Sequence, residues 1–134
     1  MSKETIIYTA GLFDGEGTVT LCKVDSKSQL RRPSISMSST SLELLQFLKE
    51  EFGGSISKHK KYKKHHRQSW SWSLCYDSAI KFMELIYPYI KELKKRKRMK
   101  MILDNYKNLT PRNGQYSQDE LIAKLSFQEE FFSI

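Results

Sequence analysis

The stretch Thr9-Ala-Gly-Leu-Phe-Asp-Gly-Glu-Gly17 decides the fold of this 134-residue chain. Apolar residues at helical spacing predict a helix from Glu4 to Gly15, which Gly17 is placed to end. Gly11 and Gly15 are four residues apart and lie on the same side of this helix, where a second backbone can approach closely. Because a glycine inside a helix costs about 0.5–1 kcal/mol relative to alanine, the pair indicates a close contact between two helices.

Two carboxylates, Asp14 and Glu16, stand at the C-terminal end of the predicted helix, where the helix dipole disfavours them by roughly 0.3–1 kcal/mol. A bound cation removes that penalty, and carboxylate and carbonyl oxygens together are the ligands that Mg²⁺ prefers. The alternative is a plain helix end, with Gly17 in the left-handed conformation and both acids in solvent. The sequence Asp-Gly-Glu-Gly by itself favours the plain helix end, and only the residues around it favour a cation site.

Four segments alternate apolar and polar residues with the period that predicts β-strands, at residues 18–24, 34–38, 55–62 and 68–75. The last one divides into an apolar face of Trp70, Trp72 and Leu74 and a hydroxylated face of Ser69, Ser71 and Ser73. We expect the tryptophans to be core residues and the hydroxyls to be free for phosphates and base edges.

Helices alternate with these pairs of strands. Thr40 with Glu43 forms a capping box for a second helix that ends at residues 53–54, and Asp77 caps a third helix that Pro88 interrupts. A fourth helix covers about residues 91–106, with an inner face of Met99, Ile102 and Tyr106.

A second capping box, Ser117 with Glu120, opens a short last helix over about residues 117–131. Pairs of strands between helices predict an α+β fold, with an antiparallel sheet and its helices on one face. No low-complexity linker interrupts the chain, so we expect residues 1–134 to form a single domain.

Positive charge is concentrated in two runs. The formal net charge is +8, and 13 of the 23 Lys and Arg residues lie in Lys58–Arg67 and Lys91–Lys100. Cations bunched beside aromatic residues indicate a polyanion, of which nucleic acid is the commonest. The alternative is two solvated basic faces.

His59, His65 and His66 lack the paired spacing of a zinc site and are expected near phosphate. Cys22 and Cys75 form no Cys-x-x-Cys pair, so we expect two free thiols in a reducing compartment. The start of the chain lacks the pattern of a signal peptide, and no apolar run is long enough to span a membrane. We therefore expect an intracellular protein of the cytoplasm or an organelle matrix, without a membrane partner.

The stretch from Thr9 to Gly17 resembles the LAGLIDADG signature of homing endonucleases. Ala10, Gly11, Leu12 and Asp14 match the pattern, Glu16 stands for its second acid, and Phe13 and Gly15 are common variants. Thr9 departs from it, because the pattern has leucine there. The element order of residues 5–106 is also similar to the family's α-β-β-α-β-β-α unit, which implies a saddle-shaped antiparallel sheet followed by an additional C-terminal helix.

The resemblance implies a homodimer, because the chain holds one motif. Its interface would include Ala10, Gly11, Asp14 and Gly15, although Asp14 is expected mainly to support the helix end. Glu16 would be catalytic and, with Gly15, would bind Mg²⁺. Mn²⁺ is expected to substitute for Mg²⁺, and Ca²⁺ to support binding without efficient turnover. Further catalytic candidates are Lys94, with Lys95 and Lys97 as close competitors, and Ser39 beside the solvent chain.

This resemblance predicts an endonuclease that cuts both strands of a long, near-palindromic duplex DNA site as part of intron homing. Outward positions chosen by alternation give the predicted DNA contacts, which are Thr18, Thr20, Cys22, Arg32, Ser34, Ser36, Lys58, Lys60, Ser69, Ser71 and Ser73. The alternatives are an intron RNA maturase and a DNA-binding protein without cleavage. An acid at Glu16 favours the nuclease, since a pure binding protein does not need one.

Overall fold

The computed structural model describes residues 1–61 and 63–134 and confirms the predicted α+β fold. The elements, in chain order, are helix α1 (Lys3–Glu16), strands β1 (Gly17–Lys23) and β2 (Arg31–Ser39), helix α2 (Leu42–Phe52), strands β3 (Ser55–Lys58) and β4 (Trp70–Cys75), helix α3 (Asp77–Ile86), the 3₁₀ turn η1 (Tyr87–Tyr89), and helices α4 (Leu93–Asn105) and α5 (Gln118–Phe132). Tyr62, which we placed at the end of a strand, lies outside the described residues.

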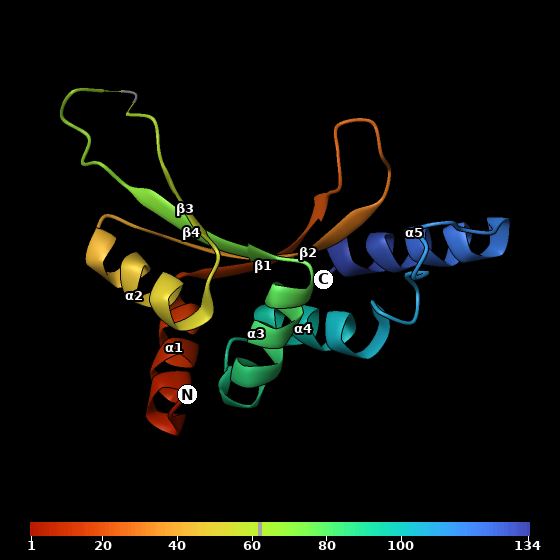
Figure 1. Cartoon of the computed structure of the whole chain (residues 1–134), viewed down its shortest axis with the longest axis horizontal. Helices are drawn as coiled ribbons and strands as arrows, with labels where there is room; N and C mark the ends of the chain where they lie inside the picture. The colour runs from red at the N-terminus through yellow and green to blue at the C-terminus, as the bar shows by residue number, and fades with distance from the viewer. Residues whose placement is uncertain (62) are drawn as a thin grey trace.

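The strands form one antiparallel sheet in the order β1-β2-β4-β3. Helices α1 to α4 lie on one side of the sheet, and the loops of its two hairpins rise on the other side, at opposite ends (Figure 1). Helix α5 lies beside the β1–β2 end. One face of the sheet is therefore left open between two raised loops.

The core lies between the sheet and helices α1 to α4. Alternate residues of the strands point into it, and Val19, Leu21, Ile35, Met37, Trp72 and Leu74 are all buried. The ring of Phe82 on α3 packs edge-on against the rings of Phe13, Phe52 and Trp72. The indole N–H of Trp72 donates to the backbone oxygen of Gly53, which satisfies the one polar atom of this fully buried side chain. Trp72 is thus a core residue, as predicted, and Trp70 is half-buried.

The junction between α1 and β1 differs from the predicted left-handed helix end. Gly17 has φ −84°, in the extended region, and is the first residue of β1. A Cβ atom at this position would lie 2.3 Å from the ring of Phe13. Glycine is therefore required here for space rather than for a positive φ, because the strand leaves the helix directly over the Phe13 ring.

Two predicted helix caps are also corrected. Ser41, not Thr40, is the N-cap of α2, and its hydroxyl donates to the Glu43 carboxylate instead of receiving a backbone N–H. Asp77 is the first residue of α3, and the N-cap is Tyr76, the one residue other than glycine with a positive φ (59°) in the described part of the chain. The capping box of Ser117 and Glu120 is confirmed at the start of α5.

Helix α5 lies within one residue of its predicted bounds and fastens the base of the β1–β2 hairpin. Phe127 and Phe131 bury one face of it. The Gln128 side chain accepts the backbone N–H of Arg31 and donates to the backbone oxygen of Gln29, at distances of 2.9 and 3.0 Å. Within the described residues, no helix has both the length and the apolar character that crossing a membrane requires.

Candidate functional site

The open face of the sheet is a continuous polar surface. Strand register places Thr18 opposite Ser36, Ser36 opposite Ser73, and Ser73 opposite Ser55. The neighbouring rows join Thr20 to Ser34 and Cys75, Cys22 to Arg32, and Ser38 to Ser71 and Ser57. We call these residues the polar face. The predicted outward positions of β1, β2 and β4 lie on it, and both cysteines are free and exposed, as expected.

The outward positions predicted for β3 are wrong. Lys58 lies opposite Trp70 and therefore belongs to the apolar face of the sheet. Lys60 lies beyond the last residue of β3. The residues of β3 that share the polar face are Ser55 and Ser57, because they lie opposite Ser73 and Ser71. Sequence reasoning missed both serines, although counting the alternation from Ile56 would have found them.

Glu16 ends α1 with an exposed side chain that makes no hydrogen bond or ion pair within the described residues. Asp14 behaves differently. Its carboxylate accepts the backbone N–H groups of Lys91 and Glu92, at distances between 3.0 and 3.1 Å. Asp14 therefore ties the end of α1 to the start of α4, while the carboxylate of Glu16 is free to meet a ligand.

Helix α1 carries the Thr9–Gly17 motif, and we call it the motif helix. Of the three candidate lysines, Lys95 is the one whose side chain bonds to it. Its Nζ donates to the backbone oxygens of Phe13 and Asp14, at 3.2 and 2.5 Å. Lys94 is exposed, and the Glu92 carboxylate accepts the backbone N–H groups of both Lys94 and Lys95. The bond from the Lys95 backbone is the main reason why the pKa of Glu92 is lowered.

A cavity of ≈ 400 Å³ lies where α4 faces the start of β1, and Gly17, the residue that follows Glu16, is part of its lining. Its lining residues are Gly17, Thr18, Val19, Glu92, Lys94, Lys95 and Arg98. Three cations against one acid make this an anion-attracting site next to an exposed carboxylate. Neither Lys97 nor Ser39 lines this cavity.

Arg98 is a lining residue that the sequence analysis did not single out. Its guanidinium donates to the backbone oxygen of Val19 at 2.9 Å and stacks over the ring of Phe131, 4.8 Å from the ring centre. Its Nε is buried without a partner. No sequence signal predicts this placement, because it depends on a residue of α5 more than thirty positions away.

Ser39 is the last residue of β2, and its side chain is half-buried. Its hydroxyl accepts the backbone N–H of Ser41 at 2.9 Å, and Ser39 lies opposite Trp70, on the apolar phase of β2. The Ser39 hydroxyl is therefore engaged within its own chain, and its place beside a chain of solvent molecules stays a prediction. The neighbouring Ser38 is the residue of this strand end that reaches the polar face.

The outer side of α1 is open. A Cβ atom added at Gly11 or Gly15 would meet nothing within 4 Å, and the nearby Ile7 and Tyr8 are 44% and 54% exposed. Ala10, which we placed in a dimer interface, is instead fully buried in the core of its own chain. The correction follows from helical spacing, since Ala10 shares the inner side of α1 with Phe13.

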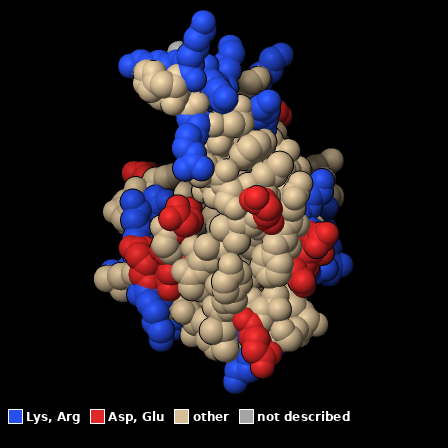
Figure 2. Space-filling view, turned by 90° about the vertical axis from the view of Figure 1, so that its left-hand side faces the viewer, with Lys and Arg blue, Asp and Glu red and all other residues tan. Residues whose placement is uncertain are grey.

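Lys and Arg side chains gather at the top of the molecule, over the loop between β3 and β4, with Asp and Glu side chains below them (Figure 2). This loop contains a second cavity, of ≈ 800 Å³. Its lining residues are Thr40, Lys58, His59, Lys60, Lys61, His66, Arg67 and Ser69. We call it the hairpin cavity. Within the described residues, no group of three or more His, Cys, Asp or Glu side chains is arranged to hold a metal ion.

The fold is similar to those of solved homing endonucleases. I-CvuI, in complex with the I-CreI target in the presence of Mg, superposes with a TM-score of 0.73 at 17% identity, covering 98% of this chain and 82% of that chain. For I-TnaI the TM-score is 0.68 at 17% identity, with coverage of 97% and 87%. I-SmaMI, bound to uncleaved DNA in the presence of calcium, gives 0.64 at 19% identity, and the match covers 96% of this chain but 45% of I-SmaMI.

No curated protein sequence matches the chain. A family model described as LAGLIDADG endonuclease matches residues 9–120, which include the motif Thr9–Gly17, the whole sheet and helices α2 to α4. That match extends over most of the chain and agrees with the motif, the element order and the sheet described above. The chain therefore belongs to the LAGLIDADG endonuclease family.

Proposed function

We propose that two copies of this protein together cut both strands of a long, near-palindromic duplex DNA site, in a reaction that depends on a divalent metal ion. The observation that carries the proposal is the exposed Glu16, which has no bonding partner within the described residues and directly precedes Gly17, a lining residue of the cavity that also holds Lys94, Lys95 and Arg98. A carboxylate next to a cluster of cations suits a phosphodiester whose charge increases during hydrolysis.

The polar face supports DNA as the substrate. It offers hydroxyl and guanidinium groups between two raised loops, and one of these loops carries a dense group of cations (Figures 1 and 2). Cations bind the phosphate backbone, and hydroxyl groups on a twisted sheet can meet base edges in a groove. The structures of I-CvuI and I-SmaMI were both determined with DNA, which agrees with this proposal.

The donor groups fit a Mg²⁺ ion that is completed by the substrate. Each chain supplies one free carboxylate, Glu16, and the carbonyl group of Gly15 is the adjacent backbone donor. Mg²⁺ is commonly held by one or two carboxylates together with phosphate oxygens of the substrate. When bound, the ion would stabilise the attacking and leaving oxygens. We propose Mn²⁺ as a substitute, with Ca²⁺ supporting binding more than turnover.

In this proposal, each of the three cations Lys94, Lys95 and Arg98 has a separate role around Glu16. Lys95 holds the last carbonyl groups of α1 and so fixes the direction in which Glu16 leaves the helix. Lys94, which is exposed at the cavity rim, is the cation free to approach a phosphate or a water molecule. Arg98 fixes the cavity wall by holding the backbone of β1 at Val19.

A homodimer is proposed because none of the described residues covers the side of α1 that carries Gly11 and Gly15. Gly11 and Gly15 leave room for a second backbone, and Ile7 and Tyr8 offer apolar area beside them. The match covers 82% of I-CvuI but 45% of I-SmaMI, so an I-SmaMI chain is long enough to hold two units of this size. Two copies would place two Glu16 carboxylates together, one for each DNA strand.

The test is incubation of the protein with a randomised duplex DNA library and Mg²⁺, followed by sequencing of the cut ends. We expect a single site whose two halves are related by two-fold symmetry. The matched variant Glu16→Gln should bind the recovered site and leave it uncut, because it keeps the size of the side chain but loses its charge. Cleavage at the wild-type rate by this variant would refute the proposed mechanism. Tight binding of intron RNA with no DNA cleavage would instead favour a maturase.

A further inference from the structure

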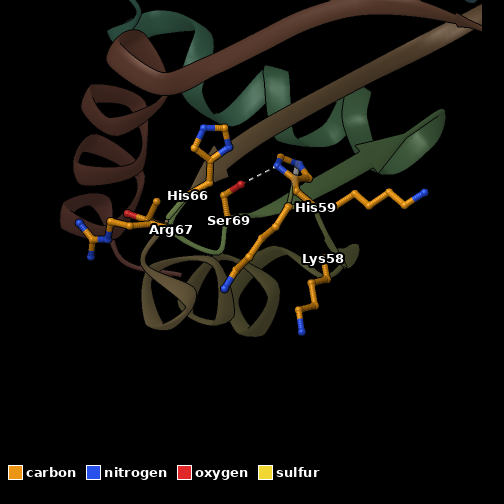
Figure 3. Close-up of a pocket in the computed structure, with 8 residues that line it drawn as sticks. Lys58, His59, His66, Arg67 and Ser69 are labelled. Atoms are coloured by element: carbon orange, nitrogen blue, oxygen red, sulfur yellow. Dashed lines mark hydrogen bonds between the residues drawn. The ribbon is translucent and has the colours of Figure 1, made fainter. Parts of the chain in front are cut away.

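Four polar side chains form a continuous hydrogen-bonded chain at the β3–β4 end of the polar face. The backbone N–H of His59 donates to the backbone oxygen of Ser69 at 2.9 Å, which continues the strand pairing one residue beyond β3 and places His59 on the polar face. Its ring Nδ1 lies 2.8 Å from the Ser69 hydroxyl (Figure 3). Its Nε2 lies 2.6 Å from the Ser71 hydroxyl. The Ser71 hydroxyl lies 2.6 Å from that of Ser38. We call these four residues the hydroxyl chain.

The number of hydrogens that the hydroxyl chain can point toward a ligand depends on whether one or both ring nitrogens of His59 are protonated. With a neutral ring, the chain has three hydroxyl hydrogens and one ring hydrogen, and its three hydrogen bonds leave one hydrogen to point outward. With both ring nitrogens protonated, the same three bonds leave two hydrogens. Protonation of His59 therefore converts one more hydroxyl into a donor for a ligand.

The charged groups around His59 are cationic. The hairpin cavity beside it is lined by Lys58, Lys60, Lys61 and Arg67, together with the titratable His66, and none of its lining residues is an acid. These cations attract a phosphate backbone into the cavity, and the negative charge of the phosphates then favours the protonated form of a nearby imidazole.

We propose that DNA binding draws a proton onto His59, and that the hydroxyl chain then donates an additional hydrogen bond to an acceptor on the DNA. This inference rests on the proposed function and adds to it a residue that couples affinity to pH. The acceptor is either a phosphate oxygen or the N7 or O6 edge of a guanine, both of which lack hydrogens. Histidine suits the task, since its unperturbed titration falls between pH 5 and 8.

The test is the dissociation constant of duplex DNA measured from pH 6 to pH 8.5, at fixed salt and with Ca²⁺ in place of Mg²⁺ so that the DNA stays uncut. The probes are the duplex recovered from the library and a random-sequence duplex of equal length. Linkage predicts that affinity falls about tenfold per pH unit above neutrality for each His59 that must take up a proton. A phosphate acceptor predicts this slope for both duplexes, and a guanine edge predicts it for the recovered duplex alone.

The matched variants are His59→Gln and His65→Gln, because both remove one imidazole from the same basic loop. His65 is exposed, and its ring packs against that of His66 rather than against the hydroxyl chain. His59→Gln should flatten the pH dependence, and His65→Gln should keep it. An unchanged slope in His59→Gln overturns the inference.

A second measurement does not depend on either variant. In the wild-type protein at pH 7.5, the NMR shifts of the His59 ring should move toward those of an imidazolium when the recovered duplex is added, and an unchanged spectrum counts against the inference. A protein that cuts DNA without a pH slope due to His59 contradicts this inference alone. A protein that binds no duplex at any pH contradicts the proposed function itself.

Discussion

The Nζ of Lys95 lies 2.5 Å from the backbone oxygen of Asp14, so a cation carried by α4 binds the last turn of the motif helix. The C-terminal end of a helix carries partial negative charge, and a cation there is favourable. The same end carries Asp14 and Glu16 in its last turn. Lys95 thus offsets the electrostatic cost of placing acids where the motif requires them.

Replacing Lys95 by methionine should destabilise the protein by about 1.5–3 kcal/mol, the usual value of hydrogen bonds to a charged group. The change leaves the carbonyl groups of Phe13 and Asp14 without this donor. Urea unfolding followed by circular dichroism measures the effect. Lys94→Met is the matched control and should unfold within about 0.5 kcal/mol of the wild type, because that side chain is exposed. A greater loss in Lys94→Met than in Lys95→Met would reverse our assignment of the two lysines.

Asp14→Asn should lower the free energy of unfolding by about 1–3 kcal/mol. Both carboxylate oxygens accept backbone N–H groups at the start of α4, and an amide retains only one oxygen for them. Thermal unfolding of the two single variants Asp14→Asn and Glu16→Gln makes the comparison direct. Glu16→Gln should unfold like the wild type, so equal losses in the two variants would contradict the separate roles given to these acids.

Gly11→Leu should abolish the proposed dimer without unfolding the chain. A Cβ atom at Gly11 meets nothing within 4 Å in its own chain, so the added side chain can obstruct only a partner. Light scattering at micromolar concentration should give the mass of a dimer for the wild type and 15.8 kDa for the variant. A wild-type protein that stays monomeric on its DNA would refute the proposed assembly.

Lys124→Met should stabilise the protein at neutral pH by about 1–3 kcal/mol. Lys124 is fully buried, its Nζ lies 3.6 Å from the ring centre of Tyr106 and bonds to the Thr110 hydroxyl, and desolvation lowers its pKa from 10.5 to about 8. Burying the charged form of Lys124 therefore lowers the free energy of unfolding, and this cost is present in full below pH 8.

The gain from this substitution should shrink as the pH rises from 8 toward 10.5, because the wild-type side chain then folds uncharged. Melting temperatures of both proteins across this range provide the measurement. A gain that is constant with pH would show that packing, rather than charge, limits stability at this position.

DNA affinity should depend strongly on salt concentration. The runs Lys58–Arg67 and Lys91–Lys100 are each doubled in a dimer, and every neutralised phosphate contributes about −0.9 to the slope of log affinity against log salt. Six or more contacts give a slope steeper than about −5. Filter binding of the recovered duplex between low and physiological salt tests this. A nearly flat slope would place these cations away from the DNA.

Features that depend on neighbouring residues in the sequence, such as strand alternation and helical spacing, were largely predictable. Alternation gave the correct phase for β1, β2 and β4, and helical spacing identified Met99, Ile102 and Tyr106 as buried residues of the fourth helical segment. Strand β3 was assigned the wrong phase because it is four residues long and holds a single apolar residue, Ile56, to define it.

Contacts between distant parts of the chain could not be predicted in this way. Arg98 reaches the cavity wall through Val19 and Phe131, and His59 joins the polar face through serines of two other strands. These placements depend on how the elements pack in three dimensions, which no local spacing records. Ser41 was missed for a different reason, since Thr40 and Ser41 are both acceptable caps by composition.

The free edge of β1 is closed by arginine side chains. Arg98 donates to the backbone oxygen of Val19 and Arg31 to that of Leu21, each at 2.9 Å, and Phe131 and Phe132 of α5 stack against these guanidinium groups. An edge strand whose carbonyl groups are occupied is a poor template for another strand, so this edge resists sheet extension and the aggregation that follows from it. In the proposed dimer, the second copy would therefore not extend the sheet through β1, and the two sheets would meet as separate halves. The spacing between the two halves of the proposed DNA target would then be set by how closely the two α1 helices approach.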